Sequence, residues 1–322
     1  MNRSEVLKSD SLKRRFLKDC SIPINVTDEP YFSERLDVLE ITHGAMTKFM
    51  KFCECMEQYN TEQEYFKDYT RVKETAMNRI KSSEGFQRFN NEVLKPINEQ
   101  FQYPKRDLYK DYNKGNSFIS IDMKKANFSA LNHYDPGIFA DNLGEESETW
   151  EDFISQFTDN EHIINSKYIR QVILGNCNPK RQIKYEDYLM HVLAKYLSDT
   201  YKGLGFYSVK NDEILINTIS FMKPEIKRVP LGEFIKTIEN EPHGIGKLVK
   251  VDMFYLYSIE CGWVRDYYGE DEQIEFKCMD ADTFHQYVKH YYEMPIGEDD
   301  LVFKHNGKLA KFLEEVENPW EQ

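Results

Sequence analysis

The chain has 322 residues, of which 40% are hydrophobic and 14% aromatic, and its formal net charge at pH 7 is −13. These values are typical of a globular protein with one large domain or two to three smaller ones, and they argue against a disordered chain. The acidic balance argues against a protein that coats nucleic acid with its whole surface, because phosphate binding needs positive charge, but it leaves room for a local basic groove.

The sequence carries no sign of a membrane or secreted protein. No stretch approaches the roughly 18 apolar residues of a membrane-spanning helix, and the charged first residues lack the apolar core of a signal peptide. The six cysteines are scattered, and only Cys53 and Cys55 lie close together, which indicates neither a disulfide framework nor a zinc site. We therefore expect an intracellular, cytoplasmic protein with free thiols and no membrane partner.

Residues 1–105 are predicted to form a helical N-terminal region. Apolar residues recur at every third or fourth position over residues 31–58, 62–82 and 86–99, which is the spacing of one helix face. A polar, turn-rich segment at 104–116 then marks the expected boundary with the next region.

Residues 106–222 are predicted to form the central α+β region. The sequence SFISIDM at 117–123 has the alternating pattern of a strand. It predicts Ile119, Ile121 and Met123 on one face and Phe118, Ser120 and Asp122 on the other. Two further apolar arms, at 206–209 and 214–219, flank a short polar turn and predict a β-hairpin. Between the strand and the hairpin, helical patterns lie at 124–134, 148–157, 161–174 and 184–201.

Residues 223–322 are predicted to be an α+β C-terminal extension. The apolar patterns predict strands at 247–259 and 272–279 and helices at 231–239, 280–291 and 308–317.

Two acidic motifs of the central region point to metal chemistry. Asp122 ends the predicted strand, while Asp212 and Glu213 lie at the tip of the predicted hairpin. Two-metal phosphoryl transfer needs carboxylates that converge from separate strands, and Mg²⁺ prefers one or two carboxylates together with water and substrate phosphates. An ordinary structural role remains the alternative, because Asp often caps a helix or turn after a strand and an Asn-Asp pair is common in tight hairpins.

The order of these motifs resembles the palm of family A DNA polymerases and the single-subunit phage RNA polymerases. In that family a metal-binding Asp ends a strand, and a later hairpin carries His-Asp-Glu; here the hairpin reads Asn211-Asp212-Glu213. The resemblance implies that Asp122 and Asp212 are metal ligands and that Glu213 supports catalysis. It also implies that Asn127 stands where the family has a Glu that screens the sugar.

The same resemblance implies a substrate-binding segment between the two motifs. The family places a Lys on a fingers helix, followed by Phe-Gly and a Tyr, and the local match here is Arg170, Leu174, Gly175 and Asn178. Arg170 would then contact a triphosphate, Leu174 and Gly175 would line the nucleotide pocket, and Asn178 would lie where the family's Tyr stacks. Additional positive charge nearby, suited to phosphate binding, comes from Lys167, Lys180 and Arg181.

The sequence thus predicts an α+β protein with a palm-like antiparallel sheet and short fingers helices. The expected activity is a nucleotidyl transfer that depends on Mg²⁺ or Mn²⁺ and extends a nucleic-acid 3′ end, with nucleic acid and nucleoside triphosphates as partners. A nuclease that uses the same carboxylates is one alternative. A non-catalytic viral replication or assembly protein with a palm-like fold is the other.

Overall fold

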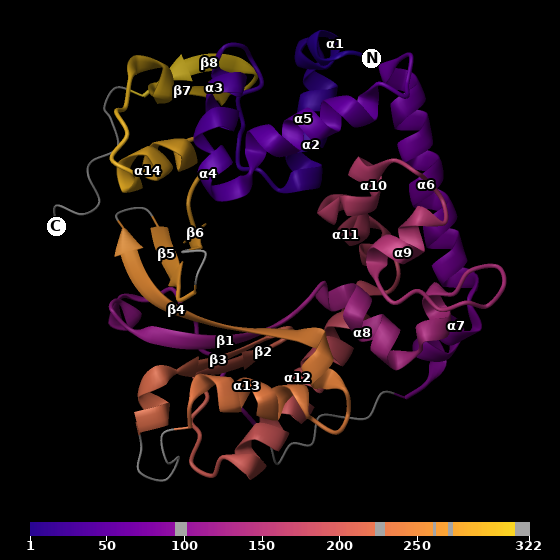
Figure 1. The fold of residues 1–322 in the computed structure, drawn as a ribbon, viewed down its shortest axis with the longest axis vertical. Coiled ribbons are helices and arrows are strands. Elements are labelled where there is room, and N and C mark those ends of the chain that lie inside the picture. The colour runs from indigo at the N-terminus through magenta and orange to yellow at the C-terminus, as the bar shows by residue number, and fades with distance from the viewer. Residues whose placement is uncertain (94–101, 223–228, 260–261, 270–272, 313–322) are drawn as a thin grey trace.

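The computed structural model describes residues 1–93, 102–222, 229–259, 262–269 and 273–312, and it confirms the expected α+β class. Helices make up most of residues 1–93, and a six-stranded antiparallel sheet occupies much of the remainder (Figure 1). The six strands lie side by side in the order β2 (Ser208–Lys210), β3 (Glu213–Asn217), β1 (Ser117–Met123), β4 (Val249–Ile259), β5 (Gly262–Tyr267) and β6 (Ile274–Lys277).

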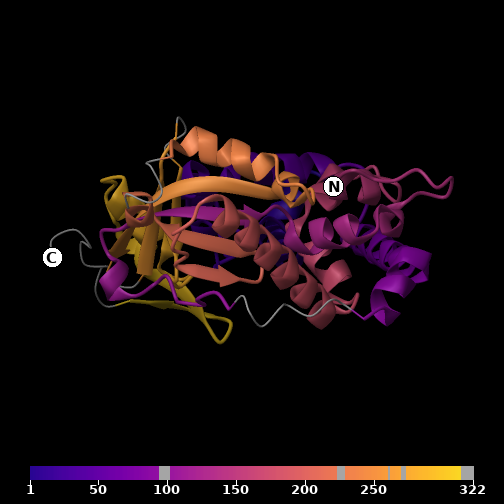
Figure 2. The same ribbon diagram turned by 90° about the horizontal axis from the view of Figure 1, so that it is seen from below.

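One face of this sheet is covered by two helices, α12 (Pro179–Thr200) and α13 (Leu231–Glu239), which lie below it in Figure 1 and in front of it in Figure 2. The alternation of β1 turns Ile119, Ile121 and Met123 toward these helices. These three side chains share a buried cluster with apolar side chains of both helices. The helix-covered face is therefore the one opposite to Phe118, Ser120 and Asp122.

The sheet and its two helices follow the split βαβ motif. In chain order the elements are β1, α12, β2, β3, α13 and β4, and β1 lies centrally between β3 and β4. The four strands of this motif pair antiparallel with their neighbours. This topology places the end of β1 directly beside the hairpin formed by β2 and β3.

The other face of the sheet, called here the open face, carries a smaller apolar cluster. Phe118, Leu215 and Phe254 are buried on it together with Leu108, which belongs to a segment running from the edge of β2 across this face. That segment pairs with the sheet edge, since the Val209 amide donates to the Pro104 carbonyl at 2.8 Å. The open face is thus partly covered near β2 and leaves the polar end of β1 uncovered.

The N-terminal region is helical, as predicted. The expected helix at 62–82 is found at those residues, where the Thr61 hydroxyl accepts the Glu64 amide and caps the first turn. The aromatic core beneath these helices is dense, with Phe16, Phe49 and Phe52 fully buried. The helices of this region are α1 (Arg3–Lys8), α2 (Asp10–Cys20), α3 (Tyr31–Val38), α4 (Glu40–His43), α5 (Ala45–Met56), α6 (Glu62–Ser82) and α7 (Glu84–Asn91).

Four helices between β1 and α12 complete this core rather than form a separate body. Trp150, Phe153, Ile169 and Ile173 are fully buried in the same cluster as the N-terminal aromatics. The four helices are α8 (Ala126–Tyr134), α9 (Trp150–Ser155), α10 (Glu161–Asn165) and α11 (Lys167–Gly175). Short 3₁₀ helices occur at η1 (Asp111–Asn113), η2 (Pro136–Phe139), η3 (Thr218–Met222), η5 (Ile245–Leu248) and η6 (Glu298–Leu301).

The C-terminal part of the chain joins both the sheet and the N-terminal helices. Because β4 lies beside β1, the boundary expected after residue 222 falls between strands of one sheet. Farther on, α14 (Phe284–Tyr291) and the hairpin of β7 (Val302–His305) and β8 (Lys308–Lys311) pack near α3. There the buried Arg35 guanidinium donates to the Val302 carbonyl.

The helix expected at 308–317 is wrong over its first residues, which form β8 instead. The deciding signal is the pair Asn306-Gly307, whose φ angles of 50° and 77° suit the tight turn of a β-hairpin. Residues 313–317 of that prediction lie outside the described residues.

Candidate functional site

The two acidic motifs meet at one end of the sheet. Asp122, the last residue but one of β1, lies directly opposite Glu213, the first residue of β3. The Met123 amide donates to the Asp212 carbonyl at 2.9 Å, so the backbones of the two motifs are hydrogen-bonded. Directly opposed residues of antiparallel strands have Cβ atoms about 4.5–5.5 Å apart. Asp122 of β1, Glu213 of β3 and Asp212 of the turn before β3 are therefore neighbours along the backbone hydrogen bonds of the sheet.

Crowding raises the affinity of these carboxylates for protons. The side chain of Asp122 reaches solvent, yet burial among the surrounding strands raises its pKa to about 6, and the charges of Glu213 and Asp212 raise it further. Burial, and then the charge of Glu213, also raises the pKa of Asp212. A fourth carboxyl, Glu186 of α12, has its pKa raised to about 7 by burial and by the charge of Asp212. Burial is thus the main cause of the raised pKa of all three carboxyls, and the charges of neighbouring carboxylates add to it.

Glu213 is held in place by two donors on the open face. Its Oε1 accepts the Ser120 hydroxyl at 2.8 Å and the Arg265 guanidinium at 3.1 Å. Arg265 extends over the Phe254 ring, with 4.7 Å between the guanidinium carbon and the ring centroid. Burial would lower the pKa of Arg265, but the charge of Glu213 and the interactions with Tyr109 and Tyr267 together raise it. Glu213 is therefore a fixed, partly neutralised carboxylate.

The side chains of Asp122 and Asp212, unlike that of Glu213, are not held by hydrogen bonds from other described residues. Over the described part of the chain, neither side chain accepts a hydrogen bond from a side chain or from the backbone of another residue. The helix after β1 has Lys125 at its N-cap position and no side-chain cap, so Asp122 does not cap it. A turn-capping role for Asp122, the structural alternative, thus has no hydrogen bond to support it.

These two carboxylates suit a hard divalent cation. Among the described residues, no three side chains of His, Cys, Asp or Glu lie close enough to hold a metal ion by themselves. Mg²⁺ nevertheless needs only one or two protein carboxylates when water and substrate phosphates supply the other ligands. Burial, and then the charge of Glu213, raises the pKa of both Asp122 and Asp212. Carboxylate oxygens are donors of the kind that Mg²⁺ and Mn²⁺ bind.

Among the predicted substrate residues, Asn127 lies on the helix that directly follows β1, and Arg170 lies on a helix packed against that one. Asn127 is the second residue of α8, and its side chain accepts the Phe128 amide at 3.0 Å. Arg170 is on α11, which packs against α2, α6 and α8. Burial lowers the pKa of Arg170, while the charge of Glu151 opposes this shift. Glu151 also pairs with Lys125, so α9 is tied to the residues that follow β1.

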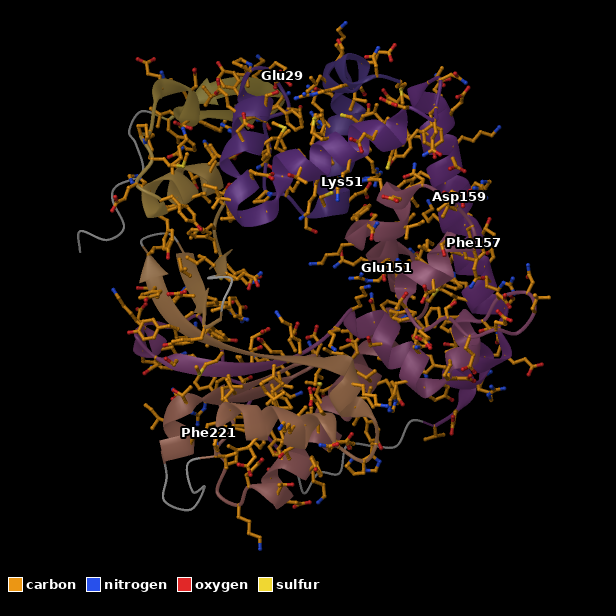
Figure 3. The ribbon with its side chains drawn as sticks, in the orientation of Figure 1. Glu29, Lys51, Glu151, Phe157, Asp159 and Phe221 are labelled. Carbon is orange, nitrogen blue, oxygen red and sulfur yellow. The ribbon has the colours of Figure 1, made fainter. Side chains whose placement is uncertain are left out.

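Lys167 at the start of α11 lines a cavity of about 440 Å³ at the junction of α2, α5, α10 and α11. Lys48 and Lys51 of α5 line the same cavity. In Figure 3, Lys51 and Glu151 lie nearer the centre of the view than Glu29 at its top or Phe221 at its bottom. Three lysines of the helical layer thus line one cavity.

The remaining predicted substrate residues surround the break between α11 and α12. Gly175 ends α11 in open space, and Lys180 is exposed on the first turn of α12. Asn178 donates to the Asn90 side chain at 2.8 Å, and Arg181 donates to the Glu92 carbonyl near the end of α7. Asn178 and Arg181 are therefore engaged in joining α12 to α7. Leu174, expected beside the nucleotide, is fully buried in the helical core.

Helix α12 connects this break to the acidic end. Glu186 lies six residues after Lys180, which corresponds to about 9 Å along a helix axis. One residue further, Asp187 accepts the Asn211 amide at 3.1 Å and fixes the hairpin turn to α12. Lys180, exposed on the first turn of α12, is thus about 9 Å along the helix axis from Glu186.

Sequence reasoning missed Glu186 and Arg265. Glu186 occupies the apolar stripe of α12 that continues through Leu189 and Leu193, so a charge on a buried helix face was the available signal. Arg265 lies within an aromatic strand, where a buried guanidinium requires a partner.

No family model matches the chain, and neither a curated protein nor a solved structure matches it significantly. No helix of the described residues is both long and apolar enough to cross a membrane.

Proposed function

We propose that the protein is a metal-dependent nucleotidyltransferase, a divergent nucleic-acid polymerase that extends a 3′ end with nucleoside triphosphates. The observation that supports this most directly is the register of β1 and β3, which puts Asp122 opposite Glu213 and next to Asp212. Phosphoryl transfer is catalysed by positioning and charge neutralisation, and both require carboxylates that converge from separate strands.

The topology of the sheet also favours a palm-like role. The acidic motifs lie where β1 meets the β2–β3 hairpin, and the helices α12 and α13 cover the face opposite to Glu213. Substrate would then approach from the open face and from the end of β1, where Asp122 reaches solvent. A sheet backed by helices on one side gives the carboxylates a rigid support.

Each acidic residue has a distinct proposed role. Asp122 and Asp212 would hold Mg²⁺ or Mn²⁺, and Glu213 would set the position of the hairpin through Ser120 and Arg265. The bound ion would supply neutralisation of phosphate charge during the in-line displacement. Arg170, Lys167 and Lys180 would provide positive charge for the triphosphate.

Primer extension tests this proposal. Folded protein is incubated with a labelled primer, alone or annealed to a template, with each nucleotide and with Mg²⁺ or Mn²⁺. We expect incorporation that Asp122→Asn and Asp212→Asn each reduce by roughly 100-fold or more, a loss typical of removing a charge-stabilising group.

Asp252→Asn is the matched control. Asp252 lies on β4 opposite Ser120 and pairs with Lys250 at 3.1 Å, so its replacement is expected to leave incorporation near the wild-type level. Absence of incorporation under every condition by correctly folded protein contradicts the proposal. Shortening of the primer without added nucleotide identifies a nuclease instead.

A further inference from the structure

A cavity of about 290 Å³ lies on the open face beside the acidic end. One wall is formed by strands of the sheet and the other by the segment that crosses from the edge of β2. Its polar lining side chains include Arg106, Lys110, Ser208, Lys210, Glu213 and Arg265. None of the substrate-binding residues that the sequence predicted lines this cavity.

The cavity carries excess positive charge in an acidic protein. Four cationic side chains line it together with two carboxylates, Asp107 and Glu213. Each carboxylate is already paired, Asp107 with Lys210 at 2.8 Å and Glu213 with Arg265 at 3.1 Å. Within the described chain, Arg106 and Lys110 form no salt bridge. Arg106 and Lys110 therefore form no close ion pair with any described residue, although Lys110 lies near enough to Asp107 for their charges to interact, while the whole chain has a net charge of −13.

Two buried donors in the wall lack a partner. The Ser208 hydroxyl has no hydrogen-bond partner, although Ser208 is only 2% exposed. The same holds for Nε of Arg265, a residue that is 9% exposed. A buried donor without an acceptor costs about 1–3 kcal/mol, so an acceptor in the cavity would relieve this cost at both atoms.

We propose that this cavity is a binding site for a compact phosphate group, either of an inorganic polyphosphate or of a nucleotide. A phosphate brings several acceptor oxygens for Ser208 and Arg265 and negative charge for Arg106 and Lys110. The volume admits a small anion between the sheet and the covering segment. Binding would not require bound metal, and it would occur whether or not the protein transfers nucleotides.

Calorimetric titration of the full chain with inorganic triphosphate in EDTA tests the site. We expect binding that weakens with salt. The double variant Arg106→Ala, Lys110→Ala should weaken it roughly tenfold or more, and Ser208→Ala roughly fivefold. Arg106 and Lys110 are exposed, so the double variant should keep its fold, which circular dichroism checks. A parallel titration with ATP distinguishes the two sources: tighter binding of ATP assigns a nucleotide, and equal binding assigns an inorganic polyphosphate.

Lys51→Ala, in the 440 Å³ cavity of the helical layer, is the matched control and should leave binding unchanged. Loss of binding in Lys51→Ala but not in the double variant overturns the assignment, because the anion then occupies the other cavity. Absence of binding by the wild type also overturns it. Neither result depends on primer extension, so failure of this site and failure of the proposed activity are distinguishable.

Discussion

Glu186 lies on the sheet-facing side of α12, where 6% of the residue is exposed. Burial, and then the charge of Asp212, raises its pKa from the usual 4.5 to about 7. A carboxyl with a raised pKa binds its proton more tightly in the folded than in the unfolded chain. The free energy of unfolding therefore falls as pH rises from about 4.5 to 7. Above pH 7 this loss of stability is complete and no longer changes with pH.

We expect Glu186→Gln to stabilise the protein at pH 8 and to have little effect at pH 4. The gain at pH 8 should be about 2–3 kcal/mol, because each pKa unit corresponds to about 1.4 kcal/mol. Urea unfolding at several pH values measures it, with Glu239→Gln at the end of α13 as a control that should show no such trend. A difference between variant and wild type that is constant from pH 4 to pH 8 contradicts this expectation.

At the scale of single residues, the sequence predicted one part of the acidic site and missed another. The period of two in residues 117–123 is enough to put Asp122 on the face of Ser120, which the structure confirms. Arg265 and Glu186 could not be placed with it, because periodicity gives the face of an element and not the element that it meets.

At the scale of elements, α2 is joined to three other helices through one carboxylate. The side chain of Asp19 is fully buried, and it accepts hydrogen bonds from Tyr69 of α6 at 3.1 Å and Ser166 at 3.0 Å. His162 of α10 lies 3.0 Å from its other oxygen, and Arg15 is 3.8 Å away. The Ser166 hydroxyl also caps α11 by accepting the Ile169 amide.

Asp19→Ala should lower the free energy of unfolding by about 3–5 kcal/mol, because it leaves several buried donors without an acceptor. Chemical denaturation measures the loss. Asp37→Ala on the exposed side of α3 is the control and should change stability by less than about 0.5 kcal/mol. A loss below about 1 kcal/mol for Asp19→Ala would show that the four helices do not depend on this carboxylate.

The same interaction explains a difference between the predicted and observed elements. The apolar pattern at 161–174 predicts one helix, but the structure has α10 and α11 with Ser166 between them. Ser166 has a ψ of 114°, outside the helical range, and its hydroxyl is used by Asp19 and by the cap of α11. Helices with uninterrupted patterns, such as 62–82 and 231–239, were predicted to the residue. The apolar pattern at 161–174 contains no information about Asp19, the distant polar partner of Ser166.

At the scale of the whole molecule, the N-terminal helices and the C-terminal hairpin are fastened together. Arg35 of α3 is 3% exposed and donates to the Val302 carbonyl of β7. Lys304 of β7 pairs with Asp28 at 2.7 Å, and Asn25 donates to Asp282 at 3.1 Å. Burial lowers the pKa of Arg35, but the group remains a cation at any ordinary pH.

We expect Arg35→Ala to release the β7–β8 hairpin from α3. Hydrogen exchange of the amides of residues 302–311 should become faster, and the free energy of unfolding should fall by about 2 kcal/mol through the lost charged hydrogen bond. Lys311→Ala removes an exposed pair with Glu298 within the same part of the chain and should leave the exchange rates nearly unchanged. Equal exchange in Arg35→Ala and wild type contradicts this role.

The kinds of element in the three expected regions could be predicted from the sequence, but the contacts between the regions could not. Helices in the first region, a strand followed by a hairpin in the second, and mixed elements in the third are all observed. Their association was not predictable from local patterns, because β1 pairs with both β3 and β4, and β4 follows it by more than a hundred residues. Alternation indicates that a strand is buried on one face, but not which strand lies beside it.

The contact between Arg35 and Val302 has a consequence for the growing chain on the ribosome. Arg35 is synthesised early, but its carbonyl acceptor exists only after a further 267 residues have been added. Similarly, the second edge of the central strand β1 can pair only after β4 has been synthesised. Domains that depend on such distant contacts close slowly and late. The N-terminal helices should therefore emerge with a surface at α3 that stays uncovered until β7 has been synthesised.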